Sequence, residues 1–380
     1  MQLVLSEDQE LLAKTASDWV REHSPVSRVR QLRDANDPTG FSRPLWKQMA
    51  ELGWVGIVFP ESYGGAGMGF ADLAVVLEAL GRTLAPEPFL STVLLGGRAI
   101  LLGGSDALKQ AWLPGICEGD KVLAFAHQEA KSRHDPFRVA STAKSDGAGF
   151  RLDGEKIQVL DAQVADALIV VARSSGGERD EAGLTLFLVP RDAVGLTITP
   201  QTRIDHRNAA LVKLDGVRVG ADAVIGAAGQ GAALLQQVID GATVGLCAEM
   251  LGAMSQVFDD TVNYLKTRLQ FGVPIGSFQA LKHRAAKVFM EIELARSAVM
   301  AASRAADASD ADFEKLVTMA KARCSDAFVL AANEAVQMFG GVGMTDEYDV
   351  GFYLKRARVA EMTFGDAAWH RERFARLSGY

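Results

Sequence analysis

Apolar residues recur every three or four positions along the last third of the chain. The clearest run falls on one face of a single long helix and consists of Leu246, Met250, Met254, Phe258, Val262 and Leu265. The same periodicity predicts further helices over about residues 278–306 and 311–339. Within the first helix, Gly241, Gly245 and Gly252 weaken helix propensity, and we expect them to admit a neighbouring backbone. An all-helical C-terminal third of this length is typical of a four-helix bundle.

The first third of the chain also has a helical pattern. Ser6 and Gln9 form the spacing of a capping box, and Pro44 suits the first turn of a second helix. An extended run then leads into glycine-rich sequence around Gly65 and Gly67. A dinucleotide-binding loop needs a third glycine three residues later, and Phe70 stands there. We therefore interpret this segment as a turn between packed elements.

The middle of the chain changes to short β-branched runs bounded by glycine, proline and aspartate. Asp-Gly pairs at 146–147, 153–154 and 215–216 predict tight turns between strands. No helical pattern separates the runs, so we predict a mostly antiparallel sheet, as a small barrel or sandwich. The predicted fold class is α+β and mostly α. Its domains are an N-terminal helical domain (1–119), a β-barrel domain (120–226) and a C-terminal four-helix bundle (227–380).

Composition narrows the classes of function. The 380 residues carry a formal net charge of −7 and no block of lysine and arginine, which argues against a nucleic-acid surface. We identify no signal peptide and no apolar run long enough to span a bilayer, so we expect no membrane partner. The three cysteines lie far apart, without metal-ligand spacing. A reducing, cytoplasmic setting is the expectation.

The stretch RLQFGVPIGSFQ, residues 268–279, carries the first candidate binding chemistry. Arg268 stands at a helix end, where its planar guanidinium suits a phosphate. Phe271 lies close to it, and an aromatic ring beside an arginine suits a planar ligand that bears phosphate. Gln279 begins the next helix.

The stretch QMFGGVG, residues 337–343, carries the second. Gly340 and Gly341 remove side chains beside Gln337, and the backbone amides of a bare turn are good donors to phosphate and ribose. Taken alone, each stretch is equally consistent with a glycine helix cap and a surface arginine.

Together these stretches identify a family. The patterns R-x-x-F-G-x-P-I-x-x-F-Q and Q-x-x-G-G-x-G-x-x-x-E-Y, with GWVGIVFPESYGGAGMG and the central strands, resemble the acyl-CoA dehydrogenases over nearly the whole chain. The resemblance implies FAD as cofactor, an acyl-CoA substrate oxidised at its α–β bond, electron-transfer flavoprotein as a partner, and an oligomer whose subunits share each flavin. The residues that it implies reach into the neighbour's flavin site are Arg268, Phe271, Gln279, Gln337, Gly340 and Gly341.

The family pattern breaks on the flavin-ring side. The strand that the family writes as T-E-P-x-A-G-S-D is QEAKSRHD here, which keeps Glu129 and Asp135. The family's W-I-T-N strand falls on residues 158–161, where Leu160 replaces the threonine that bonds to the flavin. The catalytic glutamate falls on Phe364, which cannot accept a proton. Losing a general base costs roughly 10²–10⁴ in rate.

Other carboxylates are candidates for the missing base. Some members carry the base on the long helix, at the position of Ala242, which is also incapable. Glu249 lies on the same helix face, two turns further along. Glu361 and Asp366 flank Phe364. Asp240 aligns with an acid that members use near the CoA part of the ligand, which makes it a candidate substrate-binding residue.

Three interpretations follow from this pattern. In the first, the chain resembles the base-less subunits of heteromeric acyl-CoA dehydrogenases of steroid side-chain degradation and completes a partner's FAD site. In the second, it is a homo-oligomeric enzyme of fatty acid or steroid catabolism with a relocated base. In the third, it is a non-catalytic scaffold or acyl-CoA-binding relative.

Overall fold

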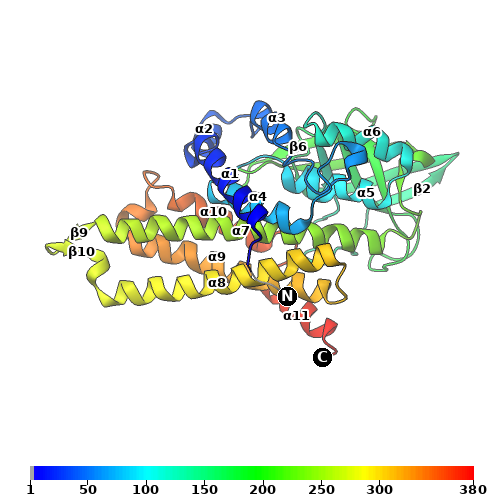
Figure 1. Ribbon diagram of the computed structural model, residues 1–380. Helices are drawn as coiled ribbons and strands as arrows, with labels where there is room; N and C mark the ends of the chain where they lie inside the picture. The colour runs from blue at the N-terminus through cyan, green and yellow to red at the C-terminus, as the bar shows by residue number, and fades with distance from the viewer. Residues whose placement is uncertain (1–3) are drawn as a thin grey trace. The chain divides into compact units, whose positions relative to one another are not determined.

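A computed structural model describes residues 4–380 (Figure 1). The chain divides into two compact units. We call the first the helical unit, which consists of the described residues up to Gln31, Gly69–Ala85 and Thr243–Tyr380. We call the second the sheet unit, which consists of Leu32–Met68 and Pro86–Ala242. Two helices run from one unit into the other, namely α2 (Val26–Ala35) and α7 (Ala232–Thr267).

The helical unit is built from long helices that follow the predicted periodicity. Besides most of α7, its helices are α1 (Glu7–His23), α4 (Phe70–Arg82), α8 (Gln279–Ala308), α9 (Phe313–Phe339), α10 (Val350–Met362) and α11 (Ala367–Leu377). Helix α9 packs against α8, α10 and α11. The capping box before α1 is confirmed, because Ser6 accepts from the Gln9 amide and the Gln9 side chain accepts from the Ser6 amide.

Two glycines allow α4 and α7 to touch along their backbones. A Cβ on Gly252 would overlap the carbonyl oxygen of Glu78, and a Cβ on Gly81 would overlap that of Glu249. The expectation that glycine in α7 admits a neighbouring backbone is therefore confirmed at Gly252. The carboxylate of Asp307 then receives the amides of the first turn of α4, which fixes α4 against α8.

The sheet unit contains the strands and the remaining helices. Its helices are α3 (Arg43–Glu51), α5 (Arg98–Gly103) and α6 (Asp106–Cys117), with a π-helix at Phe89–Gly97. Its strands are β1 (Leu123–Ala126), β2 (Thr142–Asp146), β3 (Gly149–Leu160), β4 (Ala167–Arg173), β5 (Leu184–Pro190), β6 (Leu196–Gln201), β7 (Ala209–Gly220) and β8 (Val224–Ile225). Pro44 lies in the first turn of α3, as predicted.

The strands form one mixed sheet, which corrects the prediction of an antiparallel barrel. The order is β6-β7-β3-β2-β4-β5-β8, and β1 pairs with β4. The pairings of β1 and β2 with β4 are parallel, and the strand path does not close on itself within residues 4–380. Most strand neighbours do pair antiparallel, as predicted, and the prediction was wrong in closing the sheet into a barrel and in missing the parallel pairs. Residues 127–141 lead from β1 to β2, so that both strands run in the direction of β4.

Only one of the three Asp-Gly pairs is a hairpin turn. The pair at 146–147 connects β2 to β3. The other two lie inside β3 and β7, opposite each other, where the register shifts between Leu152 and Gly154. There the Gly216 amide donates to the carboxylate of Asp153 at 2.8 Å. Both glycines have positive φ, +149° at Gly154 and +68° at Gly216, so the pairs serve as β-bulges.

Among the described residues, α7 is the one helix whose length and composition would allow it to cross a membrane. Its apolar window is entirely buried within the protein. This burial is what a central helix of a packed core shows.

Candidate functional site

The first predicted binding stretch forms an exposed hairpin between α7 and α8. Strands β9 (Leu269–Gln270) and β10 (Val273–Pro274) pair antiparallel, and Figure 1 shows them at the far end of both helices. Phe271 sits at the turn with φ +53° and a 92% exposed side chain, in edge contact with Phe278. The Ile275 amide donates to the Arg268 carbonyl at 2.9 Å, which closes the hairpin. Gln279 is the first residue of α8.

The second predicted stretch ends α9. Gly340, with φ +69°, donates its amide to the carbonyl of Gln337 and turns the chain out of the helix. A Cβ on Gly340 or Gly341 would meet no atom within 4 Å, so the glycine turn faces open space. Gln337 is also exposed. The bare backbone is therefore accessible to a ligand from outside this chain.

A cluster of three aromatic rings holds the two stretches at the same end of the helical unit. Tyr264 stacks on Phe339 with ring centroids 4.2 Å apart, and Tyr348 meets both rings edge-on. Tyr264 precedes Arg268 by one helical turn, and its carbonyl accepts the Arg268 amide at 2.8 Å. Phe339 immediately precedes Gly340. The cluster thus fixes the arginine end of α7 beside the glycine turn.

The six predicted cofactor residues form an exposed set of donors with one aromatic ring. All six are exposed, and they are Arg268, Phe271, Gln279, Gln337, Gly340 and Gly341. A guanidinium, two amides and a bare glycine turn are suitable donors for the phosphates and ribose of a dinucleotide. On the chemistry of these donors, the helical unit fits the phosphate-bearing part of FAD.

The two stretches that the resemblance places against the flavin ring, residues 128–135 and 158–161, lie in the sheet unit. Glu129 accepts the amides of Ala140 and Ser141 and the ammonium of Lys156, the last at 2.6 Å. Burial acts to raise the pKa of Glu129, but the charge and hydrogen bond of Lys156 outweigh it and the pKa is lowered. Burial lowers the pKa of Lys156 to about 8. The stretch is therefore held by internal bonds. At the other stretch, Leu160 ends β3 with a side chain that donates no hydrogen bond.

The position that the sequence resemblance predicts for the family's base lies in the turn between α10 and α11. Phe364 occupies it with φ +59°, followed by Gly365 with φ +110°. The carboxylate of Asp366 caps α11 by accepting the Trp369 amide at 2.8 Å. Glu361 pairs with Arg358 at 3.3 Å. Both acids near Phe364 therefore have structural partners.

Glu249, the candidate base on α7, lies in a buried ion pair. One of its oxygens, Oε1, accepts two bonds from the Arg356 guanidinium, at 2.6 Å from Nη2 and 3.1 Å from Nε. Both residues are less than 9% exposed. This pairing favours a structural role. The catalytic assignment of Glu249 stays a prediction, as does the substrate-binding assignment of Asp240, which is buried.

Sequence reasoning missed one buried lysine close to the base position. Lys321 of α9 is fully buried and donates to the Ser325 hydroxyl and to the carbonyls of Glu361 and Gly365. The available signal was its place in the apolar stripe of α9, where a lysine interrupts the buried series Val317, Ala320, Cys324 and Phe328.

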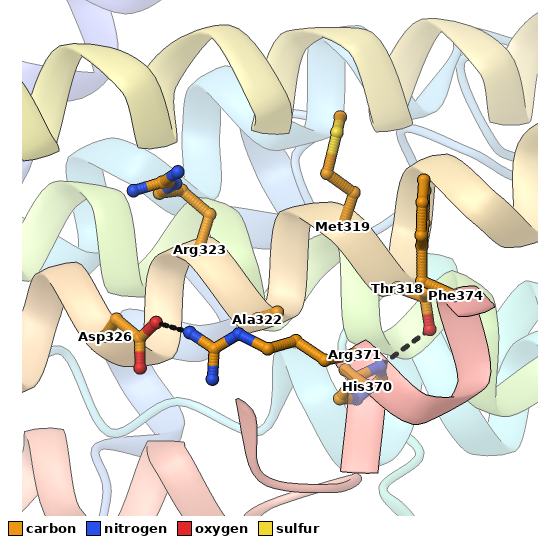
Figure 2. A pocket seen from close by; sticks show the side chains of 8 residues that line it. All are labelled: Thr318, Met319, Ala322, Arg323, Asp326, His370, Arg371 and Phe374. Carbon is orange, nitrogen blue, oxygen red and sulfur yellow. Dashed lines mark hydrogen bonds and ion pairs between the residues drawn. The ribbon is translucent and has the colours of Figure 1, made fainter. Parts of the chain in front are cut away.

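Near this lysine, a surface cavity of about 290 Å³ lies between α9 and α11 (Figure 2). Arg323 and Arg371 line it beside the apolar side chains of Met319 and Phe374. Each arginine is already paired with an acid, Arg323 with Glu291 and Arg371 with Asp326. The charges of this cavity are thus balanced within the chain.

Helices that precede and follow a central sheet, with exposed donors for phosphate and ribose, are typical of a protein that binds a dinucleotide. Comparison with known families narrows this class. The acyl-CoA dehydrogenase N-terminal, middle and C-terminal domains match residues 6–120, 124–217 and 229–378. The chain belongs to the acyl-CoA dehydrogenase family, whose members are FAD-dependent oxidoreductases, and the resemblance drawn from the sequence is confirmed.

Individual relatives agree with this assignment. Acyl-CoA dehydrogenase FadE12 of Mycobacterium tuberculosis is 31% identical over 364 residues, covering 94% of this chain and 92% of the relative. The solved ChsE4–ChsE5 complex of the same organism includes a chain 28% identical, with a TM-score of 0.90 over the full length of both chains. The glutaryl-coenzyme A dehydrogenase complex with glutaryl-CoA is 27% identical, with a TM-score of 0.91 over 100% of this chain and 98% of that one.

Proposed function

We propose that the chain is one subunit of a heteromeric FAD-dependent acyl-CoA dehydrogenase, in which it completes the partner's flavin site and supplies no base of its own. The observation that carries the proposal is an asymmetry. The groups that family members lend to a neighbour are present and exposed, whereas Phe364 stands at the base position and Leu160 at the flavin-bonding position.

The surface that carries the six predicted cofactor residues has the properties of a subunit contact. Phe271 exposes nearly its whole ring at the tip of the hairpin. Beyond the hairpin, α8 exposes Phe289, Met290 and Leu294, each by more than half. A run of large exposed apolar side chains beside a polar binding set indicates a surface that a protein covers. We propose that a second acyl-CoA dehydrogenase-like subunit covers it.

On the flavin-ring side, the chain lacks a catalytic carboxylate with which to run the reaction by itself. When bound, FAD accepts the hydride that leaves the β-carbon, and a carboxylate must remove the α-proton. The carboxylates of Glu249, Glu361 and Asp366 are each engaged in an ion pair or a helix cap. The proposal therefore places the base on the partner and assigns Arg268 and Gln337 to the partner's flavin phosphates.

The comparison that favours a heteromer is the ChsE4–ChsE5 complex, which contains two different named chains. By this likeness we propose an acyl-CoA of fatty acid or steroid catabolism as substrate and electron-transfer flavoprotein as the electron acceptor. The three cysteines are free and buried, in keeping with a reducing, cytoplasmic location, which we also propose.

Co-expression tests the proposal. The chain is produced alone and together with an acyl-CoA dehydrogenase homologue that keeps the family glutamate, and the visible absorption spectrum of each purified sample is recorded. We expect little flavin with the isolated chain and a bound flavin spectrum, bleached by acyl-CoA, in the assembly. Full flavin loading and turnover by the isolated chain would overturn the proposal.

Substitution within the assembly locates the contribution of this chain. Arg268→Ala should lower the flavin content of the assembly, because it removes a bidentate donor to phosphate. Arg21→Ala is the matched control, since Arg21 is also exposed and lies on α1, away from the hairpin residues. Equal flavin content in both variants would favour the interpretation of the chain as a scaffold.

A further inference from the structure

The segment over residues 361–366 comprises the end of α10 and the turn that leads into α11, and we call it the 361–366 turn. At position 364 it has a backbone that its sequence does not favour. Phe364 adopts φ +59°, in the left-handed region that a bulky aromatic residue rarely occupies. Such conformations persist where the surroundings determine them strongly, and they gather at functional sites.

Lys321 holds this turn through hydrogen bonds to main-chain carbonyls. Its ammonium has three N–H groups, and each has an acceptor: the Glu361 carbonyl at 2.9 Å, the Gly365 carbonyl at 2.7 Å and the Ser325 hydroxyl at 3.0 Å. Two of these acceptors belong to the turn. An amine buried to this degree is expensive to keep charged, and burial lowers its pKa to about 8.

His370 fixes the carbonyl between the two that Lys321 holds. Its Nε2 lies 3.0 Å from the Phe364 carbonyl, which can only accept, so Nε2 carries the proton. Its Nδ1 is hydrogen-bonded to the Thr318 hydroxyl at 2.9 Å, a bond that Figure 2 shows. The carbonyls of residues 361, 364 and 365 are therefore all held, and none of these bonds involves the side chain at position 364.

We propose that Lys321 is the positioning residue of the 361–366 turn and fixes where side chain 364 stands, whatever that side chain is. The inference rests on the proposed function for the meaning of position 364, which is that of the family base. It explains why the left-handed backbone remains although the phenylalanine side chain cannot accept a proton. A glutamate introduced at this position would be presented from the same backbone.

Amide hydrogen exchange of the turn, measured by mass spectrometry on the purified chain and on its assembly, tests the inference. Lys321→Met removes all three donors and keeps an apolar stem of similar length. Exchange over residues 361–367 should rise about tenfold or more, because two bonds to the turn are lost. Ser325→Ala, which removes only the acceptor outside the turn, should leave exchange there within about twofold. Lys321→Arg, which keeps charge and donors, should restore part of the protection.

A double-mutant cycle separates positioning from general stabilisation. Phe364→Gly makes the left-handed backbone favourable by itself. In that background Lys321→Met should raise turn exchange by roughly threefold or less, since the turn no longer needs to be held. Where Lys321→Met does not fold, Lys321→Gln, which keeps two donors, is used in both backgrounds.

Equal acceleration by Lys321→Met with and without Phe364→Gly would overturn the inference, and so would unchanged exchange in Lys321→Met alone. The measurement needs neither flavin nor turnover. Its failure therefore leaves the proposed heteromer standing, and a failed co-expression leaves this inference standing.

Discussion

The ion pair between Glu249 and Arg356 offers the sharpest test of whether this chain holds its own base. Both side chains are buried, and the two N–H groups of Arg356 converge on a single oxygen of Glu249. Glu249→Gln keeps the shape but removes the negative charge that accepts both of these bonds, which weakens the pairing of a buried guanidinium. Breaking a buried pair in this way costs about 3–5 kcal/mol. We expect a fall of roughly 4–6 °C in the melting temperature, measured by calorimetry on the assembly.

The double variant Glu249→Leu, Arg356→Met distinguishes structure from catalysis. Replacing a buried pair by apolar side chains of similar volume is neutral or stabilising by about 1–4 kcal/mol. If Glu249 is structural, the double variant should recover both the melting temperature and the rate of flavin reduction by acyl-CoA in the assembly. If Glu249 is the base, stability should recover while the rate stays down by about 10²–10⁴. A stable but inactive double variant would refute our reasoning about Glu249.

Three further predictions concern stability. Because the pKa of Lys321 is about 8 in the folded chain and ordinarily 10.5, the unfolded chain binds its proton more tightly. Stability should rise relative to Lys321→Met between about pH 8 and pH 10.5, by up to roughly 3 kcal/mol, in denaturant titrations at each pH. Gly252→Ala should destabilise the chain by more than about 2 kcal/mol through overlap with Glu78, whereas Gly351→Ala, which meets open space, should not, as thermal melts can show. Ser6→Ala should cost about 1 kcal/mol, seen by circular dichroism, and no loss would contradict the capping assignment.

The sequence predicted the helices well because their signal is local and long. The stripe on α7 and the capping box before α1 both depend on neighbours within two helical turns. The strand connections depend on partners far away. An Asp-Gly pair has the same local preference in a hairpin as in a bulge, and only the facing Asp153 and Gly216 decide between them. The order of the strands and the parallel pairings could not be predicted from the sequence for the same reason.

The two stretches of the candidate site are contiguous motifs that can be found in the sequence, and their role in binding a cofactor stays a prediction. The hairpin at Arg268 and the glycine turn at Gly340 were both located from short patterns, and the structure adds the aromatic cluster that joins them. The helix cap formed by Asp366 has a local partner, the Trp369 amide, and was missed all the same. The Arg356 partner of Glu249 was not predicted, because an ion pair between distant helices leaves no local trace. Lys321 was overlooked for a related reason: its acceptors are backbone carbonyls, which any sequence possesses.

The predicted base position and the predicted set of cofactor residues have separate supports in the structure, which agrees with the proposed heteromer. The aromatic cluster of Tyr264, Phe339 and Tyr348 fixes the exposed donors, and it includes no residue of the 361–366 turn. The turn is fixed through its carbonyls by Lys321 and His370, independently of side chain 364. A phenylalanine at the predicted base position therefore disturbs neither support. A subunit built this way can give up proton transfer and still hold a neighbour's cofactor, which is the behaviour that the proposed heteromer requires.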